Sequence, residues 1–217
     1  RLCPGVPMLA LSATAAPRVS ADIIRLLDLR SPLVQVSSAR RDNLHYAMRR
    51  RPRDPMPLVL EALEQGRGAT LIYARTRRSV ERWAERLREL DVPATPYHAG
   101  LEPEARREAL TLFLEHERPV LVATVAFGMG VDRADVGLVL HLDLPSTPEG
   151  YLQESGRAGR DGQPAFCLVL FSPGDRTSLG WAMQAASRGS ASPEDGRRLD
   201  LAQQQLRRME AVAEGEM

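Results

Sequence analysis

The amino-acid sequence predicts an α/β fold with a central, mostly parallel sheet. Short runs of strand-forming residues alternate with amphipathic helical patterns along the chain, which is typical of strand–helix–strand units. The strand candidates are continuous apolar runs without alternation, as expected for strands that are buried on both faces. The chain has no internal repeats, so a repeat architecture is excluded.

Four strands and two helices are predicted in the central part of the chain. The strands are expected at residues 69–74, 119–124, 137–141 and 166–171. A helix follows the first strand, and its apolar side chains share one stripe: Val80, Trp83, Ala84, Leu87 and Leu90. A second helix begins at Glu102-Pro103, since proline suits a first turn, and it has apolar residues at helical spacing: Ala105, Ala109, Leu112 and Phe113.

The two ends of the chain follow other patterns. Strands at 8–11 and 33–36 flank a helix at 19–27, which is typical of the end of a preceding α/β domain. Residues 39–57 are rich in arginine and broken by proline, so we interpret them as the passage into the main domain. Two polar helices are expected beyond Pro173, at 175–187 and 194–213.

Composition excludes several kinds of site. The formal net charge of the 217 residues is +1, so any attraction to nucleic acid must be local. All 29 basic residues are arginine, which excludes a phosphate-loop lysine and a lysine general base within this chain. Cys3 and Cys167 provide neither a disulfide framework nor a zinc site, and we expect Cys167 to be a buried thiol and no metal to be bound. With only these two cysteines, we expect a reducing, cytoplasmic setting. Residues 119–131, like the other uncharged stretches of the chain, are shorter than the roughly 20 residues of a membrane helix.

Residues 151–162 carry the strongest chemical signal. Arg157 and Arg160 are three positions apart, so they share one face if the local turn is helical. Three glycines in the segment allow close approach of the backbone, and paired guanidinium groups suit phosphate. The alternative interpretation is a pair of surface arginines bridged to Glu154 and Asp161.

The loop after the second predicted strand is a second candidate site. Thr124 ends that strand, and Gly128, Gly130 and Asp132 follow it. Ligands of α/β sheets bind beyond the carboxyl ends of strands, so Thr124 and the loop amides are predicted to hold a phosphate, and Asp132 a sugar hydroxyl. The dinucleotide-binding fingerprint fails, because Arg133 stands where its third glycine belongs. A tight turn that needs small residues is the alternative.

Three further segments are weaker candidates. Ser12 and Thr14 follow a predicted strand, although a helix cap explains them equally well. His98 ends another strand, where a lone histidine is usually structural. Residues 73–78 begin a helix with three arginines, where a phosphate would be favoured, although plain solvated surface is the more common explanation.

In this order, the segments resemble the second motor domain of superfamily 2 helicases, and specifically of the RecQ family. Residues 12–14 match helicase motif III, 71–77 motif IV, 97–101 the family's YHAGL, 123–132 motif V and 151–162 motif VI. In motif VI, Gln153 followed by glutamate and serine resembles the RecQ form of the motif, whereas DEAD-box proteins usually begin it with histidine. The resemblance implies a RecA-like three-layer sandwich with a mostly parallel sheet, followed by C-terminal helices.

The resemblance also implies a division of the chain. Residues 1–38 would end a first RecA-like domain, 39–172 would form the second, and 173–217 would begin a zinc-binding subdomain without reaching its cysteines. The chain opens at Arg1 without an initiator methionine, so we expect it to be part of a longer protein. Walker A and B would lie in the upstream RecA-like domain in cis, and this chain alone is expected to be inactive.

For the intact protein the resemblance implies an ATP-dependent 3′→5′ DNA helicase of recombination and repair in the bacterial cytoplasm, associated with the nucleoid. Arg160 would be the arginine finger, Arg157 would support the phosphate, and Gln153 would position this network or the attacking water. Residues that would contact ATP are Gly128, Gly130, Asp132, Arg157 and Arg160. ATP and Mg²⁺ would be bound mainly by the upstream lobe, and Zn²⁺ belongs to the full-length family but not to this chain.

DNA contacts and coupling are assigned by the same resemblance. Single-stranded and partially duplex DNA would be gripped by Arg75, Thr76, His98 and Thr124, and Ser12 and Thr14 would couple the lobes. The chain departs from the family at Arg133, where lysine is usual, at 74–76, where Cys-Asn-Ser is usual, and at Asp42, where proline is usual. Two alternatives stay open: a nucleic-acid-binding module without catalysis, and an RNA helicase of another superfamily 2 branch.

Overall fold

The computed structural model describes residues 6–12, 17–37, 40–125, 132–172, 174–175, 177, 203–204, 206–209 and 211. The chain divides into two compact units, Arg1–Arg41 and Asp42–Met217. The predicted helices at 175–187 and 194–213 fall almost wholly outside the described residues, as do Thr14, Gly128 and Gly130.

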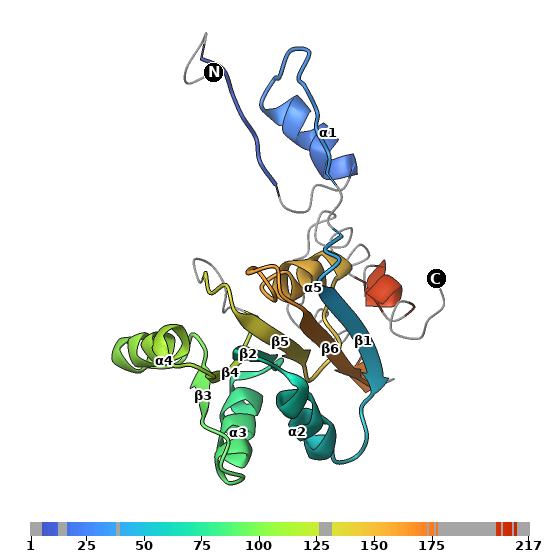
Figure 1. The fold of residues 1–217 in the computed structure, drawn as a ribbon. Helices are drawn as coiled ribbons and strands as arrows, with labels where there is room; N and C mark the ends of the chain where they lie inside the picture. Colours follow the sequence, from blue (N-terminus) through green and yellow to red (C-terminus); the bar gives the residue numbers. More distant parts are fainter. Residues whose placement is uncertain are drawn as a thin grey trace. The chain divides into compact units, whose positions relative to one another are not determined.

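The larger unit is built on one sheet of six parallel strands. In chain order these are β1 (Leu44–Arg50), β2 (Ala69–Tyr73), β3 (Ala94–Tyr97), β4 (Val120–Ala123), β5 (Val136–His141) and β6 (Ala165–Phe171). They lie side by side in the order β1-β6-β5-β2-β4-β3, and every neighbouring pair is parallel. The helices are α2 (Met56–Gln65), α3 (Arg77–Arg88), α4 (Pro103–Glu115) and α5 (Pro148–Ser155) (Figure 1). This arrangement confirms the predicted RecA-like α/β fold.

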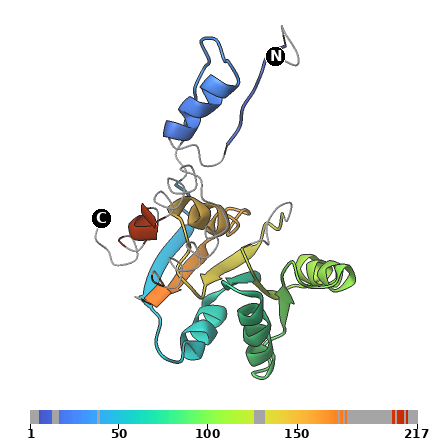
Figure 2. The same ribbon diagram turned by 180° about the vertical axis from the view of Figure 1, so that it is seen from behind.

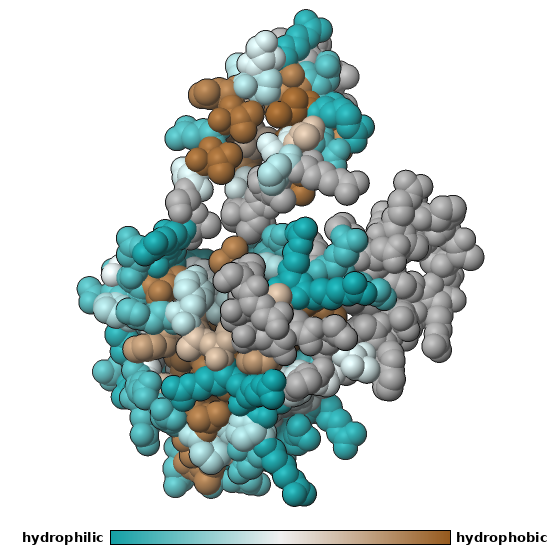
Figure 3. Space-filling view, turned by 90° about the vertical axis from the view of Figure 1, so that its right-hand side faces the viewer, coloured by the Kyte–Doolittle hydropathy of each residue, from teal (hydrophilic) through white to brown (hydrophobic). Residues whose placement is uncertain are grey.

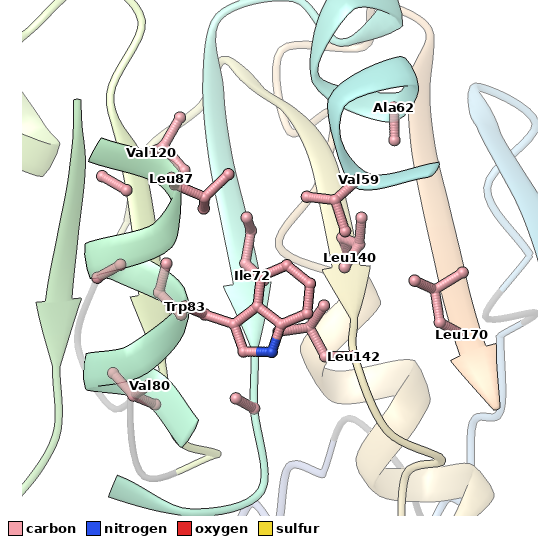
Figure 4. Packing of buried hydrophobic residues seen from close by; sticks show 14 of the residues in the cluster. Val59, Ala62, Ile72, Val80, Trp83, Leu87, Val120, Leu140, Leu142 and Leu170 are labelled. Carbon is pink, nitrogen blue, oxygen red and sulfur yellow. The ribbon is translucent and has the colours of Figure 1, made fainter. Parts of the chain in front are cut away.

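Helices cover both faces of the sheet, so its central strands are buried on both sides. On one face, α2 and α3 lie beside each other (Figures 1 and 2) and cover alternate strand residues such as Ile72 and Leu140. Trp83 of α3 lies over the sheet at this interface (Figure 4). On the opposite face, Phe113 of α4 packs in a cluster that includes Leu121 and Cys167. Cys167 has no exposed surface, which confirms the predicted buried thiol.

Two strands lie outside the four predicted ranges: β3, of which only the end at His98 was expected, and β1, which was not expected at all. β1 lies within the stretch that we interpreted as a passage, and it pairs with β6 along its whole length. Most of its side chains are exposed, and the strand ends in Arg49 and Arg50. A strand at the edge of a sheet needs no apolar run on both faces, so its sequence carries little signal. The helix predicted to include Leu90 ends earlier, at Arg88, and Leu90 is exposed.

The smaller unit contains helix α1 (Pro17–Leu26), close to its predicted position. Residues 8–11 and 33–36, however, form no strand in the described structure. Leu11 and Leu33 are 85% and 92% exposed, and Figure 3 shows hydrophobic residues gathered on the surface of this unit. A strand requires a neighbour for its backbone groups, and the described residues of this unit provide none.

The described residues contain neither a membrane-spanning helix nor a cluster of metal-binding side chains. No helix among them is long and apolar enough to cross a bilayer. No group of three or more histidine, cysteine, aspartate or glutamate side chains within that part of the chain could hold a metal ion.

Arg133 joins the end of α4 to the start of β5. Its Nε and Nη2 donate to the two carboxylate oxygens of Asp135, at 2.6 and 3.0 Å, and its Nη1 donates to the carbonyl of Phe113. The guanidinium also lies over the Phe113 ring, 5.6 Å from its centroid. A lysine has one ammonium group and cannot reproduce this fork, so the departure from the family at this position creates a structural contact.

We therefore predict that Arg133→Lys lowers the free energy of unfolding of the chain by about 1–3 kcal/mol, measured by chemical denaturation. The Arg133 hydrogen bonds hold the pKa of Asp135 below its usual 3.8, so the contribution of this pair is present at neutral pH. This contribution to stability disappears as the pH falls through the lowered pKa of Asp135. The difference in unfolding free energy between the Arg133→Lys and wild-type chains should therefore narrow in acid. Arg107→Lys, at an exposed position on α4, is the control. Equal stability of the Arg133→Lys and wild-type chains at pH 7 would contradict the prediction.

Candidate ATP and nucleic-acid sites

Four predicted DNA-binding residues lie along the edge of the sheet that is formed by the carboxyl ends of its strands. Arg75 and Thr76 follow β2, Thr124 follows β4 and His98 follows β3, and these three strands are neighbours. The Ala74 amide donates to the Ala123 carbonyl at 2.9 Å, and the Thr124 amide donates to the Tyr97 carbonyl at 3.2 Å. The carboxyl ends of three strands thus bring together residues that are separated in the sequence.

The start of α3 is cationic at this edge. Thr76 is the N-cap residue, and its Oγ1 accepts the Ser79 amide at 3.1 Å, which leaves the hydroxyl proton able to point outward. Arg77 and Arg78 are exposed in the first turn, which contains no acidic residue. The positive end of the helix dipole disfavours cations there, so these arginines suit an external anion better than they suit the helix itself.

His98 is buried at this edge, with 3% of its surface exposed. The Gly100 amide donates to Nδ1 at 3.2 Å, which places the ring proton on Nε2, 3.1 Å from Glu81. Both ring nitrogens are therefore engaged within the protein. In this conformation His98 shapes the loop that follows β3, and a direct contact of its ring with a phosphate would require these bonds to break.

Arg75 faces carboxylates. Its backbone amide donates to Asp143 at 3.1 Å, and its Nη2 lies 3.5 Å from Asp175, which is buried. Arg51 donates to the same two carboxylates, at 2.8 and 2.7 Å. Burial lowers the pKa of Arg51, but Asp175 and Asp143 more than offset this, so its pKa is raised. This network joins the ends of β1, β2, β5 and β6, and sequence spacing gave no sign of it.

The segment that contains Arg157 and Arg160, which we call the arginine segment, is bonded to the protein near the start of β5, away from the carboxyl ends of the strands. The Gly159 amide donates to Val136 at 2.8 Å and the Asp161 amide donates to Ala134 at 3.1 Å, beside the start of β5. Helix α5 ends at Ser155, so the condition under which Arg157 and Arg160 would share a helical face is not met. Both arginines lie in the turns that follow the helix.

Gly159 explains part of the glycine pattern. Its φ of 54° is in the left-handed region, and a Cβ there would lie 2.5 Å from Nδ2 of Asn43. Asn43 donates to the carbonyls of Gly159 and Gln163, at 2.8 Å each. The close approach that the glycines allow is therefore, at this position, an approach to the protein's own chain.

The two arginines have different surroundings. Arg160 is paired with Asp132, and their side chains are 37% and 83% exposed. Arg157 lies beside the hydroxyl of Tyr73, where burial raises the pKa of Tyr73 to about 12 and the charge of Arg157 opposes that rise. The alternative pairing with Glu154 and Asp161 differs from what is observed, because Asp161 binds Arg67 at 2.8 Å and Glu154 contacts His141.

The predicted residues thus separate into two groups. Thr124 lies at the carboxyl end of β4, whereas Asp132 precedes β5 and pairs with Arg160. Gln153 is exposed on α5, one residue before Glu154. Ser12 is exposed in the smaller unit.

A buried polar cluster near Arg157 was not predicted from the sequence. His141 is 2% exposed, and its Nε2 lies 2.7 Å from Oε2 of Glu154. Its ring stacks on Tyr73 with centroids 5.0 Å apart and contacts Tyr151 edge to face at 5.3 Å. A histidine at the end of an otherwise apolar strand was the available signal, because such a residue breaks the pattern of a buried strand.

Comparison with known proteins identifies relatives of the chain. A family model, the helicase conserved C-terminal domain, matches residues 55–162. An ATP-dependent DNA helicase RecQ from Pasteurella multocida (strain Pm70) is 41% identical over 172 residues, which cover 79% of this chain and 27% of that protein. The RecQ helicase of Haemophilus influenzae (strain ATCC 51907 / DSM 11121 / KW20 / Rd) is 39% identical over 172 residues, covering 79% and 28%. A RecQ-like DNA helicase BLM from Xenopus laevis is 38% identical over 192 residues, covering 86% and 14%.

The chain therefore spans about a quarter of the length of its bacterial relatives. These matches agree with the order of motifs along the chain and with the RecA-like sheet on which those motifs lie. The chain belongs to the RecQ family of superfamily 2 helicases and carries the helicase conserved C-terminal domain.

Proposed function

We propose that this chain is the second motor lobe of an ATP-dependent 3′→5′ DNA helicase that unwinds DNA in recombination and repair in the bacterial cytoplasm. One observation carries the proposal. A cationic, hydroxyl-bearing edge lies at the carboxyl ends of β2, β4 and β3, and an accessible arginine segment is hydrogen-bonded to the start of β5 in the same sheet. Such a body can grip a nucleic-acid backbone with one edge while the other completes an ATP site against a neighbouring lobe.

Arg160 is proposed as the arginine finger toward the γ-phosphate of ATP. The exposed ion pair with Asp132 is worth about 0–1 kcal/mol, so releasing the guanidinium costs little. Charge spreads over the equatorial phosphate oxygens as the bond breaks, and a guanidinium placed there stabilises the transition state. Release also leaves Asp132 available to a ribose hydroxyl, with Gly128 and Gly130 nearby in sequence.

Arg157 and Gln153 are proposed to assist Arg160. Arg157 is held beside Tyr73 and would support the phosphate or an acidic group of the first lobe. Gln153 is exposed on the preceding helix and would orient the attacking water or the arginines themselves. Mg²⁺ would be held mainly by the first lobe.

Single-stranded DNA is proposed to bind along the carboxyl ends of β2, β4 and β3. Thr76 and Thr124 would donate hydroxyl or backbone hydrogen bonds to phosphates, and Arg75 and the start of α3 would supply positive charge. His98 would contribute by holding the adjacent loop. Contacts of this kind recognise the backbone and carry no sequence preference.

The domain division is proposed on the same basis. Residues 1–38 would end the first RecA-like domain, 39–172 would form the second, and 173–217 would begin the zinc-binding subdomain. The exposed apolar residues of the smaller unit, including Leu9 and Leu33, support a missing sheet neighbour upstream. Ser12 and Thr14 would then couple the two lobes.

In the full-length protein, Arg160→Ala is expected to lower the ATPase kcat by about 10³- to 10⁵-fold, because the transition state loses its guanidinium. Single-strand affinity should stay nearly intact, since the DNA edge lies at the other end of the strands. Steady-state phosphate release and fluorescence anisotropy check the two parts. Arg107→Ala, exposed on α4, is the matched control. Unchanged turnover of Arg160→Ala would refute the finger assignment.

The purified 217-residue chain should show no measurable ATP hydrolysis and only weak nucleotide binding. The reason is that the chain contains no lysine and therefore no Walker A lysine of its own. A phosphate-release assay with the full-length protein as the positive control tests this. Robust turnover by the chain alone would contradict it.

Replacing Arg77 and Arg78 together by alanine should weaken single-strand binding at every sequence. If each arginine neutralises one phosphate, the slope of log affinity against log salt should fall in magnitude by about 1.4. Binding titrations at several salt concentrations measure the slope, and Arg107→Ala again serves as the control. An unchanged slope would show that the start of α3 does not contact the DNA backbone.

Unwinding of RNA duplexes in preference to DNA duplexes would favour the RNA helicase alternative.

A further inference from the structure

We propose that Tyr73, His141 and Glu154 form a buried polar cluster that positions Arg157 for its work in the ATP site. The inference rests on the proposed function and names three positioning residues for it. None of the three would touch ATP.

The cluster is tightly built from two strand ends and one helix. His141 ends β5, Tyr73 ends β2, and Glu154 lies in the last turn of α5. The His141 ring is stacked on Tyr73, at 5.0 Å between centroids and 23° between planes. Its Nε2 donates to Glu154 across 2.7 Å, so one residue contacts both of the others.

Packing alone does not account for these residue types. His141 and Tyr73 are 2% exposed, and the Glu154 side chain is 15% exposed. Nδ1 of His141 is buried without a hydrogen-bond partner among the described residues. Burying a carboxylate and an imidazole costs free energy that apolar side chains of similar volume would avoid. A function that requires a directed hydrogen bond explains their presence.

The geometry leads from this cluster to Arg157. Glu154 precedes Arg157 by three residues, and the Arg157 amide donates to the Glu154 carbonyl at 3.3 Å. The charges of Arg157 and Glu154 act in opposite directions on the pKa of the buried Tyr73 hydroxyl, so that hydroxyl is within electrostatic reach of both side chains. The next residue, Ala158, is fully buried in the same apolar layer. Anchoring Glu154 therefore fixes the turn from which Arg157 projects.

A double-mutant cycle in the full-length protein tests the proposal. His141→Ala, Arg157→Ala and the double variant are compared by steady-state ATPase kinetics with saturating single-stranded DNA. His141→Ala alone should lower kcat by about 10- to 100-fold, because a misplaced catalytic group loses rate of that order. In the Arg157→Ala background it should change kcat by less than about twofold, since there is no longer a guanidinium to position.

Conservative variants separate positioning from folding. Glu154→Gln retains an oxygen that accepts the His141 proton and should keep most of kcat, whereas Glu154→Ala should lose it. If His141→Ala fails to fold, Tyr73→Phe keeps the ring and removes only the hydroxyl, and it enters the same cycle with the same expected non-additivity. His116→Ala, an exposed histidine after α4, is the matched control and should leave kcat unchanged.

Failure of this inference differs from failure of the proposed function. Equal fold-losses from His141→Ala in the wild-type and Arg157→Ala backgrounds would overturn the positioning role, as would full activity of both Glu154→Ala and Tyr73→Phe. An Arg157→Ala protein with undiminished kcat would instead overturn the proposed role of Arg157 itself. Thermal denaturation of each variant identifies losses that come only from unfolding.

Discussion

The burial of a parallel sheet on both faces is the constraint on which the rest of this structure depends. Strand interiors such as Ile72 and Val139 must be apolar, because their backbone groups are satisfied in the ladder and water is absent. Hydroxyl and charged groups are therefore displaced to strand ends and to the loops beyond them. The cationic edge around Thr76 and the loop that carries Arg160 both follow from this displacement, and the rigid sheet sets the distance between them.

Arginine supplies every basic side chain here, and burial decides what each one does. Arg133 and Arg51 are mostly shielded, bind carboxylates or carbonyl groups with their forks, and join elements that are distant in sequence. Arg160 instead meets Asp132 in an exposed pair that can be exchanged at little cost. The same side chain is thus a structural tie when desolvated and an exchangeable ligand for phosphate when it is accessible.

The polar cluster of Tyr73, His141 and Glu154 interrupts the apolar layer beneath α5. It lies where the ends of β2 and β5 meet the helix that leads into the arginine segment. The residue that follows Tyr73 begins the loop of the proposed DNA edge. A single buried cluster therefore borders both groups of candidate site residues, although they occupy different ends of the sheet.

The sequence by itself determined the α/β class, the central strands, helices α3 and α4 and the order of motifs that marks the family, because burial on two faces and helical spacing leave local patterns. It also selected Arg160 and Asp132 as candidates, but it grouped Asp132 with Thr124, and it placed Arg157 and Arg160 on one face only on the condition of a helical turn. Only the tertiary structure decided that Thr124 and Asp132 lie near different strand ends, that β1 forms an edge of the sheet and that His141 reaches Glu154. Strand order and side-chain direction depend on contacts between residues far apart in the chain, and such contacts leave no periodicity to read.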